Sequence, residues 1–243
     1  MKLLSKFSKR ISLGLQPYCT AVVAAGGNST RMGGENKLLA TIGGKPVIVH
    51  TLLALEQAKR VKEIVIATRA DDIPKYAALC KQYGIKKVSK VVIGGSTRVE
   101  SVFNGILQAN NRAKLIAVHD AARPFATPEL IDRVIERANL TLAAAPAIAV
   151  HDTIKIAQDG VVTSTPQREN LFAVQTPQVF DASVLCAALQ YAMQKNLPVT
   201  DDCSAVEKLG KQVYLVDGDE QNFKITTKLD LVLAEKIMED KME

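Results

Sequence analysis

The sequence of 243 residues contains few of the residues that build several common functional sites. It has no Trp, 5% aromatic residues, three histidines and four cysteines. The cysteines are Cys19, Cys80, Cys186 and Cys203, with no CxxC pair and no nearby histidine. We therefore expect neither a disulfide framework nor a protein-bound metal site, and a reducing cytoplasm fits these cysteines best.

Long apolar runs and a basic body are also absent. No stretch approaches the roughly 20 apolar residues that a membrane span requires, so no membrane partner is expected. The formal net charge is +6, but Lys2, Lys6, Lys9 and Arg10 lie in the first ten residues and no acidic residue precedes Glu35. The rest of the chain is close to neutral and poor in aromatics, which argues against a nucleic-acid partner.

Residues 1–18 are expected to form a basic N-terminal extension ahead of one domain, residues 19–243. The extension contains apolar residues at helical intervals: Leu3, Leu4, Phe7, Ile11 and Leu15. Its composition is similar to that of transit peptides and surface-seeking amphipathic helices, but it is short for either role. We expect a mobile or loosely docked extension.

Short apolar runs alternate with helical stretches from Thr20 onward. The expected strands are Ala21–Ala24, Ile64–Thr68, Val88–Ile93, Leu115–Val118 and a weaker, Ala-rich Leu142–Ala145 that Pro146 stops. The expected helices are about Pro46–Ala58, Ile73–Tyr83, Arg98–Asn110 and Pro128–Asn139, with Pro46 and Pro128 at first helical positions and Thr127 as an N-cap. This alternation predicts a single three-layer α/β/α domain with a mostly parallel, Rossmann-like sheet.

The alternation stops after Pro146. Ile148–Ala157 and Val161–Thr165 are two β-prone pieces joined by Gln158-Asp159-Gly160, a hairpin-turn signal, so we expect a protruding β-hairpin arm over about residues 148–170. The remaining expected elements are helices at about Ala182–Lys195 and Asp202–Leu209, strands at Val213–Val216 and Phe223–Thr226, and a final helix from Lys228, capped by Thr227 with Asp230.

Residues Thr20 to Lys37 combine a buried-strand pattern with a loop of four glycines that carries Arg31 and Lys37. Glycines let successive backbone N–H groups converge on an anion, and two fixed cations can neutralise phosphate charge. The loop matches neither G-x-G-x-x-G nor a P-loop, so by itself it leaves the phosphate chemistry open. Ligands of parallel sheets bind beyond the carboxyl ends of the strands, so the loops after Ala24, Ile93 and Val118 should meet there.

Three further stretches narrow the chemistry: Gly94–Val102, Val118–Pro124 and Gln175–Gln178. With the glycine loop they resemble the nucleotidyltransferases that have a GT-A-like Rossmann fold, and specifically the 2-C-methyl-D-erythritol 4-phosphate cytidylyltransferase family. The resemblance runs from about Thr20 to the C-terminus. The family usually has Pro-Lys-Gln around its catalytic lysine, where this chain has Asn36-Lys37-Leu38, a departure that concerns the rigidity of the loop more than its chemistry.

The resemblance implies transfer of CMP from CTP to a sugar-alcohol phosphate, with Mg²⁺ bound mainly through the triphosphate. It implies that Arg31 and Lys37 stabilise charge at the α-phosphorus and that Arg168 and Lys224 hold the acceptor phosphate. The implied CTP-binding residues are Ala24, Ala25, Gly26, Gly95, Arg98, Ser101 and Asp120. The implied acceptor-binding residues are Asp120, Arg123, Thr153, Arg168, Thr176 and Lys224. Thr153 and Arg168 would reach a neighbouring subunit's site, which implies a homodimer formed through the arm.

Other interpretations remain open on spacing alone. Arg98 is compatible with a solvated helix start, Asp120 with a turn cap, and Lys224 with an edge-strand charge. Asp201-Asp202 is interpreted as a helix start with a structural role. A ribitol 5-phosphate cytidylyltransferase would share most CTP motifs, and a catalytically silent nucleotide-binding regulator could use the same fold. Retention of both Arg31 and Lys37 argues against the regulator, because a pure binder needs no charges aimed at the α-phosphorus.

Overall fold

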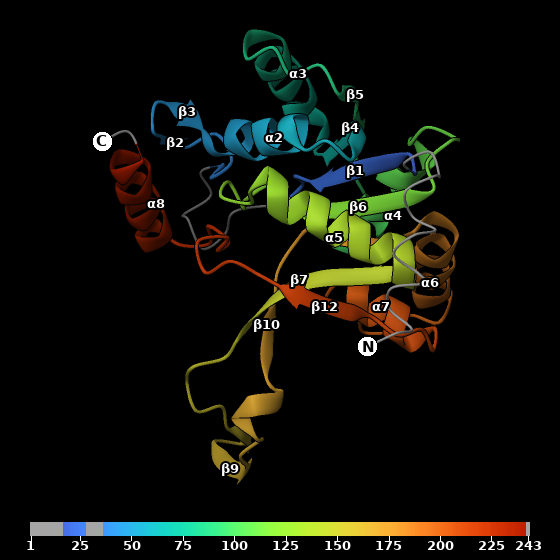
Figure 1. Ribbon diagram of the computed structural model, residues 1–243, viewed down its shortest axis with the longest axis vertical. Coiled ribbons are helices and arrows are strands. Elements are labelled where there is room, and N and C mark those ends of the chain that lie inside the picture. Colours follow the sequence, from blue (N-terminus) through green and yellow to red (C-terminus); the bar gives the residue numbers. More distant parts are fainter. Residues whose placement is uncertain (1–16, 28–35, 242–243) are drawn as a thin grey trace, which may run out of the picture.

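A central sheet of eight strands organises the chain (Figure 1). The computed structural model describes residues 17–27 and 36–241. Four parallel strands follow the spatial order β5 (Val88–Ile93), β4 (Val61–Thr68), β1 (Cys19–Ala24) and β6 (Leu115–Asp120). The mostly parallel sheet predicted from the alternating pattern is confirmed.

The other half of the sheet is built around β7 (Ala143–Ala149). The antiparallel strand β11 (Gln178–Asp181) connects β6 to the start of β7. The antiparallel strand β10 (Phe172–Val174) pairs with the end of β7, and β12 (Tyr214–Asp217) runs parallel to β7. A separate two-stranded pair is formed by β2 (Thr41–Ile42) and β3 (Lys45–Pro46).

Helices cover both faces of the sheet, as the three-layer prediction requires. One apolar cluster packs α2 (Val47–Gln57), α3 (Ile73–Gln82), α5 (Pro128–Thr141) and α8 (Lys228–Asp240). The other packs α4 (Arg98–Leu107), α6 (Ala182–Gln194) and α7 (Asp202–Lys208). Side chains of β1 alternate between the clusters, with Ala21 and Val23 in the first and Val22 in the second, because successive strand residues face opposite sides. Among the described residues no helix is long and apolar enough to cross a membrane.

The helix starts follow local capping chemistry. Thr127 accepts a hydrogen bond from the Leu130 N–H, and Pro128 is the first residue of α5, as predicted. Thr227 and Asp230 form a reciprocal capping box at α8, also as predicted. Pro46 is the N-cap of α2 rather than its first helical residue. The caps at Thr127 and Thr227 satisfy backbone N–H groups that the helix itself leaves without partners, whereas Pro46 makes no side-chain cap bond.

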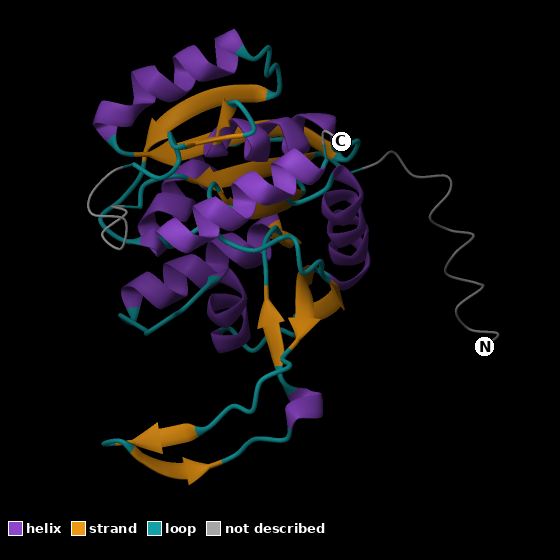
Figure 2. Cartoon of the chain, turned by 90° about the vertical axis from the view of Figure 1, so that its left-hand side faces the viewer, coloured by secondary structure: helices purple, strands orange, loops and turns teal. Residues whose placement is uncertain are grey.

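The arm is a hairpin of β8 (Ile156–Gln158) and β9 (Val161–Ser164) that stands away from the sheet (Figure 2). Its turn residues Asp159 and Gly160 both have positive φ, 50° and 80°, which is the backbone that a two-residue hairpin turn of the I′ type needs. The predicted turn is confirmed. The strands are shorter than expected, because Ile148 and Ala149 belong to β7 of the main sheet and a 3₁₀ turn, η4 (Arg168–Asn170), leads from the arm to β10.

Two strand predictions were wrong. Pro146 does not stop β7; it lies between the stretch that pairs with β11 and the stretch that pairs with β10, so its missing N–H removes no bond to either. Phe223–Thr226 is not a strand, although the segment is β-prone. It is held instead by the burial of Ile225 and by hydrogen bonds that include the one from the Ile225 N–H to the Ala122 carbonyl, 2.9 Å.

Candidate active site

A pocket of about 380 Å³ opens at the carboxyl ends of β1, β5 and β6. The loops after Ala24, Ile93 and Val118 meet there, as the sheet topology predicted. The described residues that line it are Ala24, Gly26, Gly27, Lys37, Leu38, Gly95, Ser96, Thr97, Arg98, Ser101, Asp120, Ala121, Ala122, Lys224 and Thr226. Small residues and cations both line the pocket, which gives it room for a ligand and charge for an anion.

The wall formed by the loop before α4 admits only glycine at position 95. A Cβ on Gly95 would lie 2.2 Å from the Glu100 Cβ and 3.1 Å from the Glu100 carbonyl carbon. The Gly95 N–H donates to the Ser101 Oγ at 3.0 Å, and that hydroxyl donates to the Thr97 carbonyl at 2.8 Å. The loop is therefore fixed on the first turn of α4, where Thr97 and Glu100 form a capping box.

Asp120, the last residue of β6, is surrounded by cations. The Lys224 Nζ lies 2.9 Å from Asp120 Oδ2, and Arg98 and Arg123 each lie 3.7 Å from an Asp120 oxygen. Burial alone would raise the pKa of Asp120, but the charges of Lys224, Arg98 and Arg123 lower it to about 2. Asp120 is therefore ionised at neutral pH and pairs with three cations, of which Lys224 and Arg98 line the pocket.

A second carboxylate, Asp202 at the start of α7, supports the pocket from behind Arg98. Its Oδ2 lies 2.8 Å from Arg98 Nη2, and the residue is fully buried. Burial raises the pKa of Asp202, and the Arg98 charge opposes that rise. Burial would lower the pKa of Arg98, but Asp202 and Asp120 raise it. Asp202 is the first residue of α7, as predicted, and Asp201 caps that helix through the Ser204 N–H at 2.8 Å; in addition, the Asp202 carboxylate pairs with Arg98.

Lys37 also lines the pocket. Its Nζ donates to the Ile225 carbonyl at 2.7 Å. Ile225 is also bonded to Ala122, and its neighbours Lys224 and Thr226 line the pocket. The segment before α8 therefore connects the lysine after the glycine loop to the end of β6.

Thr176 and Arg123 lie behind Asp120 instead of lining the pocket. The Thr176 Oγ1 accepts the Asp120 N–H at 3.1 Å and lies 2.9 Å from the His119 Nδ1. Arg123 donates to the Asn222 carbonyl, and the Asn222 side chain donates to the Thr176 carbonyl at 3.0 Å. Burial lowers the pKa of His119 to about 4, so its ring is neutral at pH 7. These groups fix the position of Asp120.

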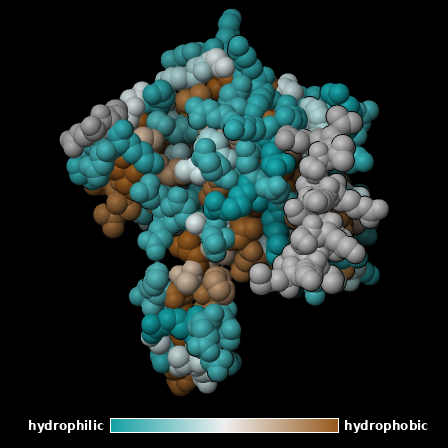
Figure 3. Space-filling model, viewed as in Figure 1, coloured by the Kyte–Doolittle hydropathy of each residue, from teal (hydrophilic) through white to brown (hydrophobic). Residues whose placement is uncertain are grey.

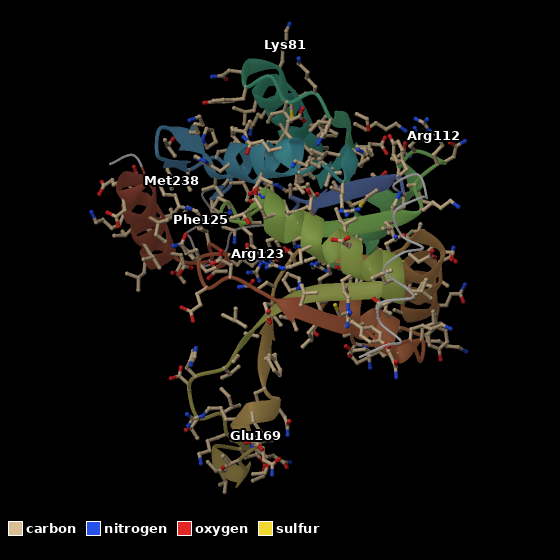
Figure 4. The ribbon with its side chains drawn as sticks, viewed as in Figure 1. Lys81, Arg112, Arg123, Phe125, Glu169 and Met238 are labelled. Atoms are coloured by element: carbon tan, nitrogen blue, oxygen red, sulfur yellow. The ribbon has the colours of Figure 1, made fainter. Side chains whose placement is uncertain are left out.

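The sequence-predicted residues fall into four groups. Eight line the pocket: Ala24, Gly26, Lys37, Gly95, Arg98, Ser101, Asp120 and Lys224. Ala25, Arg123 and Thr176 are behind it, with Ala25 and Thr176 buried. Thr153 and Arg168 are exposed on the arm, where the Arg168 Nη2 donates to the Thr153 Oγ1 at 2.9 Å. Figure 4 shows Arg123 within the body and Glu169, the neighbour of Arg168, on the arm. Arg31 lies outside the described residues.

Sequence reasoning assigned no site role to seven of the described lining residues, Gly27, Leu38, Ser96, Thr97, Ala121, Ala122 and Thr226, and it did not connect Asp202 to Arg98. The available signal for Asp202 was the pair Asp201-Asp202, since one carboxylate is enough to cap a helix. Thr226 gave no signal, because its segment was taken for a strand. In the described ranges, no group of three or more His, Cys, Asp or Glu side chains could hold a metal ion.

Comparison with known proteins gives one consistent result. Residues 19–240 match the IspD family, described as 2-C-methyl-D-erythritol 4-phosphate cytidylyltransferase. A relative of that name from Bacillus cereus is 41% identical over 220 residues, which are 90% of this chain and 97% of the relative. Another from Caldanaerobacter subterraneus is 40% identical over 223 residues, 89% of this chain and 96% of the relative.

Solved structures agree with the sequence relatives. The crystal structure of 4-diphosphocytidyl-2C-methyl-D-erythritol synthase from Anaerococcus prevotii has a TM-score of 0.83 and 29% identity, covering 92% of this chain and 97% of that one. The 2-C-methyl-D-erythritol 4-phosphate cytidylyltransferase from Thermus thermophilus has a TM-score of 0.74 and 32% identity, covering 90% and 98%. The chain therefore belongs to the 2-C-methyl-D-erythritol 4-phosphate cytidylyltransferase family.

Proposed function

We propose that this protein transfers CMP from CTP to 2-C-methyl-D-erythritol 4-phosphate, forming 4-diphosphocytidyl-2-C-methyl-D-erythritol and pyrophosphate in the non-mevalonate isoprenoid pathway. The observation that carries the proposal is the pocket itself. It brings Gly26 and Gly27 after β1, the loop before α4 and a set of cations around Asp120 to one sheet edge. Family membership supplies the identity of the two substrates.

The reaction needs no general base, so the cations that line the pocket suit it. The attacking phosphate monoester has a second pKa of about 6, so it is largely dianionic at pH 7. The acceptor phosphate attacks the α-phosphorus of CTP, a new P–O bond forms, and the bond to the pyrophosphate breaks in line. The demand on the protein is to bring anions together and to stabilise charge on the pentacoordinate phosphorus, which is work for cations.

We assign roles along the pocket. Lys37 and Arg31 stabilise the charge that develops at the α-phosphorus. The small residues Ala24, Ala25, Gly26, Gly95 and Ser101, together with Arg98, bind the cytidine and its phosphates through backbone groups and the guanidinium. Asp120 holds Lys224 against the acceptor phosphate, and Thr176 and Arg123 hold Asp120.

The pocket fits a Mg²⁺ ion that enters with the nucleotide. Asp120 is the one carboxylate among the described lining residues, and Lys224 already occupies its Oδ2. Mg²⁺ commonly keeps few protein ligands and binds substrate phosphates. The triphosphate would supply most of its ligands, and the ion would neutralise charge on the triphosphate oxygens.

We further propose a cytoplasmic homodimer that forms through the arm. All four cysteines are free, which suits a reducing compartment. The arm exposes apolar side chains that an isolated hairpin cannot bury: Ile154, Ile156, Val161 and Val162. Figure 3 shows apolar surface, in brown, on the arm. A second copy offering the same arm would bury both sets, and Thr153 and Arg168 would then serve the partner's pocket.

The test is pyrophosphate release from CTP and 2-C-methyl-D-erythritol 4-phosphate, with the diphosphate product identified by ³¹P NMR. Lys37→Ala and Arg31→Ala should each lower kcat by about 10²–10³ while CTP binding weakens much less, because their contacts strengthen as charge builds. Wild-type kcat in both variants would refute these assignments. Absence of the diphosphate product with wild-type protein would refute the function.

A further inference from the structure

Asn36, the residue before Lys37, makes hydrogen bonds through both the nitrogen and the oxygen of its side chain. We call this set of bonds the clamp on Asn36. Its Nδ2 lies 3.3 Å from Asp72 Oδ2 and 3.2 Å from the Tyr76 hydroxyl, and donates to both. Its Oδ1 accepts the Leu38 N–H at 3.1 Å, which closes a turn around Lys37. The side chain therefore connects the backbone on either side of Lys37 to η3 (Ala70–Asp72) and α3, more than thirty residues away.

Asp72 and Tyr76, which accept the hydrogen bonds from Asn36, are themselves held in place. Tyr76 is fully buried and Asp72 is 1% exposed. Asp72 also accepts hydrogen bonds from Arg69 and from Lys75, the latter at 3.0 Å. Burial alone would raise the pKa of Asp72, but Arg69 and Lys75 lower it, so the acceptor is charged at neutral pH. A charged, buried acceptor holds an amide donor more firmly than a neutral or exposed one.

Hydrogen bonds from the end of β4 connect this region to the pocket loops. The Thr68 hydroxyl, at the end of β4 just before Arg69, donates to the Ala25 carbonyl at 3.1 Å. The Thr68 carbonyl accepts the Gly94 N–H at 2.7 Å. Asn36 is thus bonded to the segment that directly follows this strand end, which in turn contacts two of the pocket loops.

We infer that Asn36 is a positioning residue for Lys37. Hydrogen bonds from Asn36 to Asp72 and Tyr76 restrict the backbone before the lysine, and the Ile225 carbonyl accepts the lysine head group. This inference rests on the proposed role of Lys37 in CMP transfer.

The experiment compares four proteins in the CMP-transfer assay: Asn36→Ala, Tyr76→Phe, Lys37→Ala and Asn36→Ala/Lys37→Ala. Asn36→Ala should lower kcat by about 10- to 100-fold, since displacement of a catalytic group by about 1 Å costs that much, and should leave KM for CTP within about threefold. Tyr76→Phe removes one acceptor and should lower kcat by about 3- to 10-fold. Asn36→Ala should cause no further loss in the Lys37→Ala background, because its effect passes through the lysine.

Asn139→Ala on the exposed side of α5 and Tyr83→Phe after α3 are the matched controls and should keep wild-type kcat. Thermal unfolding of every variant separates loss of fold from loss of positioning. Wild-type kcat in both Asn36→Ala and Tyr76→Phe, or an Asn36→Ala loss that persists in full without Lys37, would overturn the inference. Wild-type kcat in Lys37→Ala would instead refute the proposed role of the lysine.

Discussion

At the scale of single residues, Asp120 holds the charges of the pocket in place. Its pKa of about 2 in the folded protein is below its ordinary value of 3.8. A carboxylate whose pKa is lowered by folding contributes stability that is fully present above its unfolded pKa and is lost as the pH falls through its folded pKa. The stabilisation due to Asp120 should therefore be complete above about pH 5 and decline below pH 4.

This pH dependence is measurable as a difference between two proteins. The free energy of unfolding of the wild type should exceed that of Asp120→Asn at pH 5, and the gap should shrink by about 1 kcal/mol by pH 3. Urea unfolding at both pH values gives the two free energies. A gap that stays constant from pH 5 to pH 3 would mean that Lys224, Arg98 and Arg123 do not lower the pKa of Asp120.

Some residue roles could be predicted from the sequence and others could not. Lys37 and Arg98 stand beside glycine-rich turns after strands, a local pattern with a known physical reason. Asp202 acts through Arg98, which lies more than a hundred residues earlier, and only the packing of α7 against the sheet brings them together. The spacing of Asp202 and Arg98 in the sequence does not indicate that contact. The clamp on Asn36 was hidden for the same reason.

At the scale of elements, the loop before α4 depends on the absence of a side chain at Gly95. The Cβ of Gly95→Ala would overlap Glu100, which caps the helix and accepts N–H groups from Ser96 and Thr97. We expect a cost of about 1–3 kcal/mol in stability because the backbone must shift. KM for CTP should rise by about tenfold or more, because the same loop forms the pocket wall.

Thermal unfolding and steady-state kinetics of Gly95→Ala check this expectation. Gly27→Ala is the control for stability, because a Cβ there meets no atom within 4 Å. Equal unfolding temperatures for both variants would show that the loop relaxes without cost, contrary to the steric argument.

Elements governed by local rules were predicted well, and elements set by tertiary pairing were not. The caps at Thr127 and Thr227 and the turn at Asp159-Gly160 follow from neighbouring residues alone. The three-residue strand β10 is too short to show a periodic pattern, and its identity comes from its register on β7. Phe223–Thr226 shows the reverse case, in which β-prone residues find no strand to pair with.

At the scale of the whole molecule, the arm stands away from the main sheet, as Figure 1 shows, and the pocket lies at the edge of that sheet. If the arm serves a partner's pocket, two inactive proteins should complement each other. Mixing Arg168→Ala with Lys37→Ala under conditions that allow subunit exchange should restore up to about a quarter of wild-type activity, because half of the dimers are mixed and each has one complete site.

The control for this experiment is each variant exchanged with itself, which should remain inactive. Native mass spectrometry verifies that mixed dimers form. Verified mixed dimers without recovered activity would mean that Arg168 serves its own subunit, and the proposed sharing of sites would be withdrawn.

The claim that this protein makes 4-diphosphocytidyl-2-C-methyl-D-erythritol is tested most directly by its choice of acceptor. With CTP saturating, kcat/KM should be measured for 2-C-methyl-D-erythritol 4-phosphate and for ribitol 5-phosphate in parallel. We predict a preference of about 100-fold or more for 2-C-methyl-D-erythritol 4-phosphate, because a site built to bind one polyol leaves polar groups unpaired with the other. Equal values, or a preference for ribitol 5-phosphate, would contradict the proposed function.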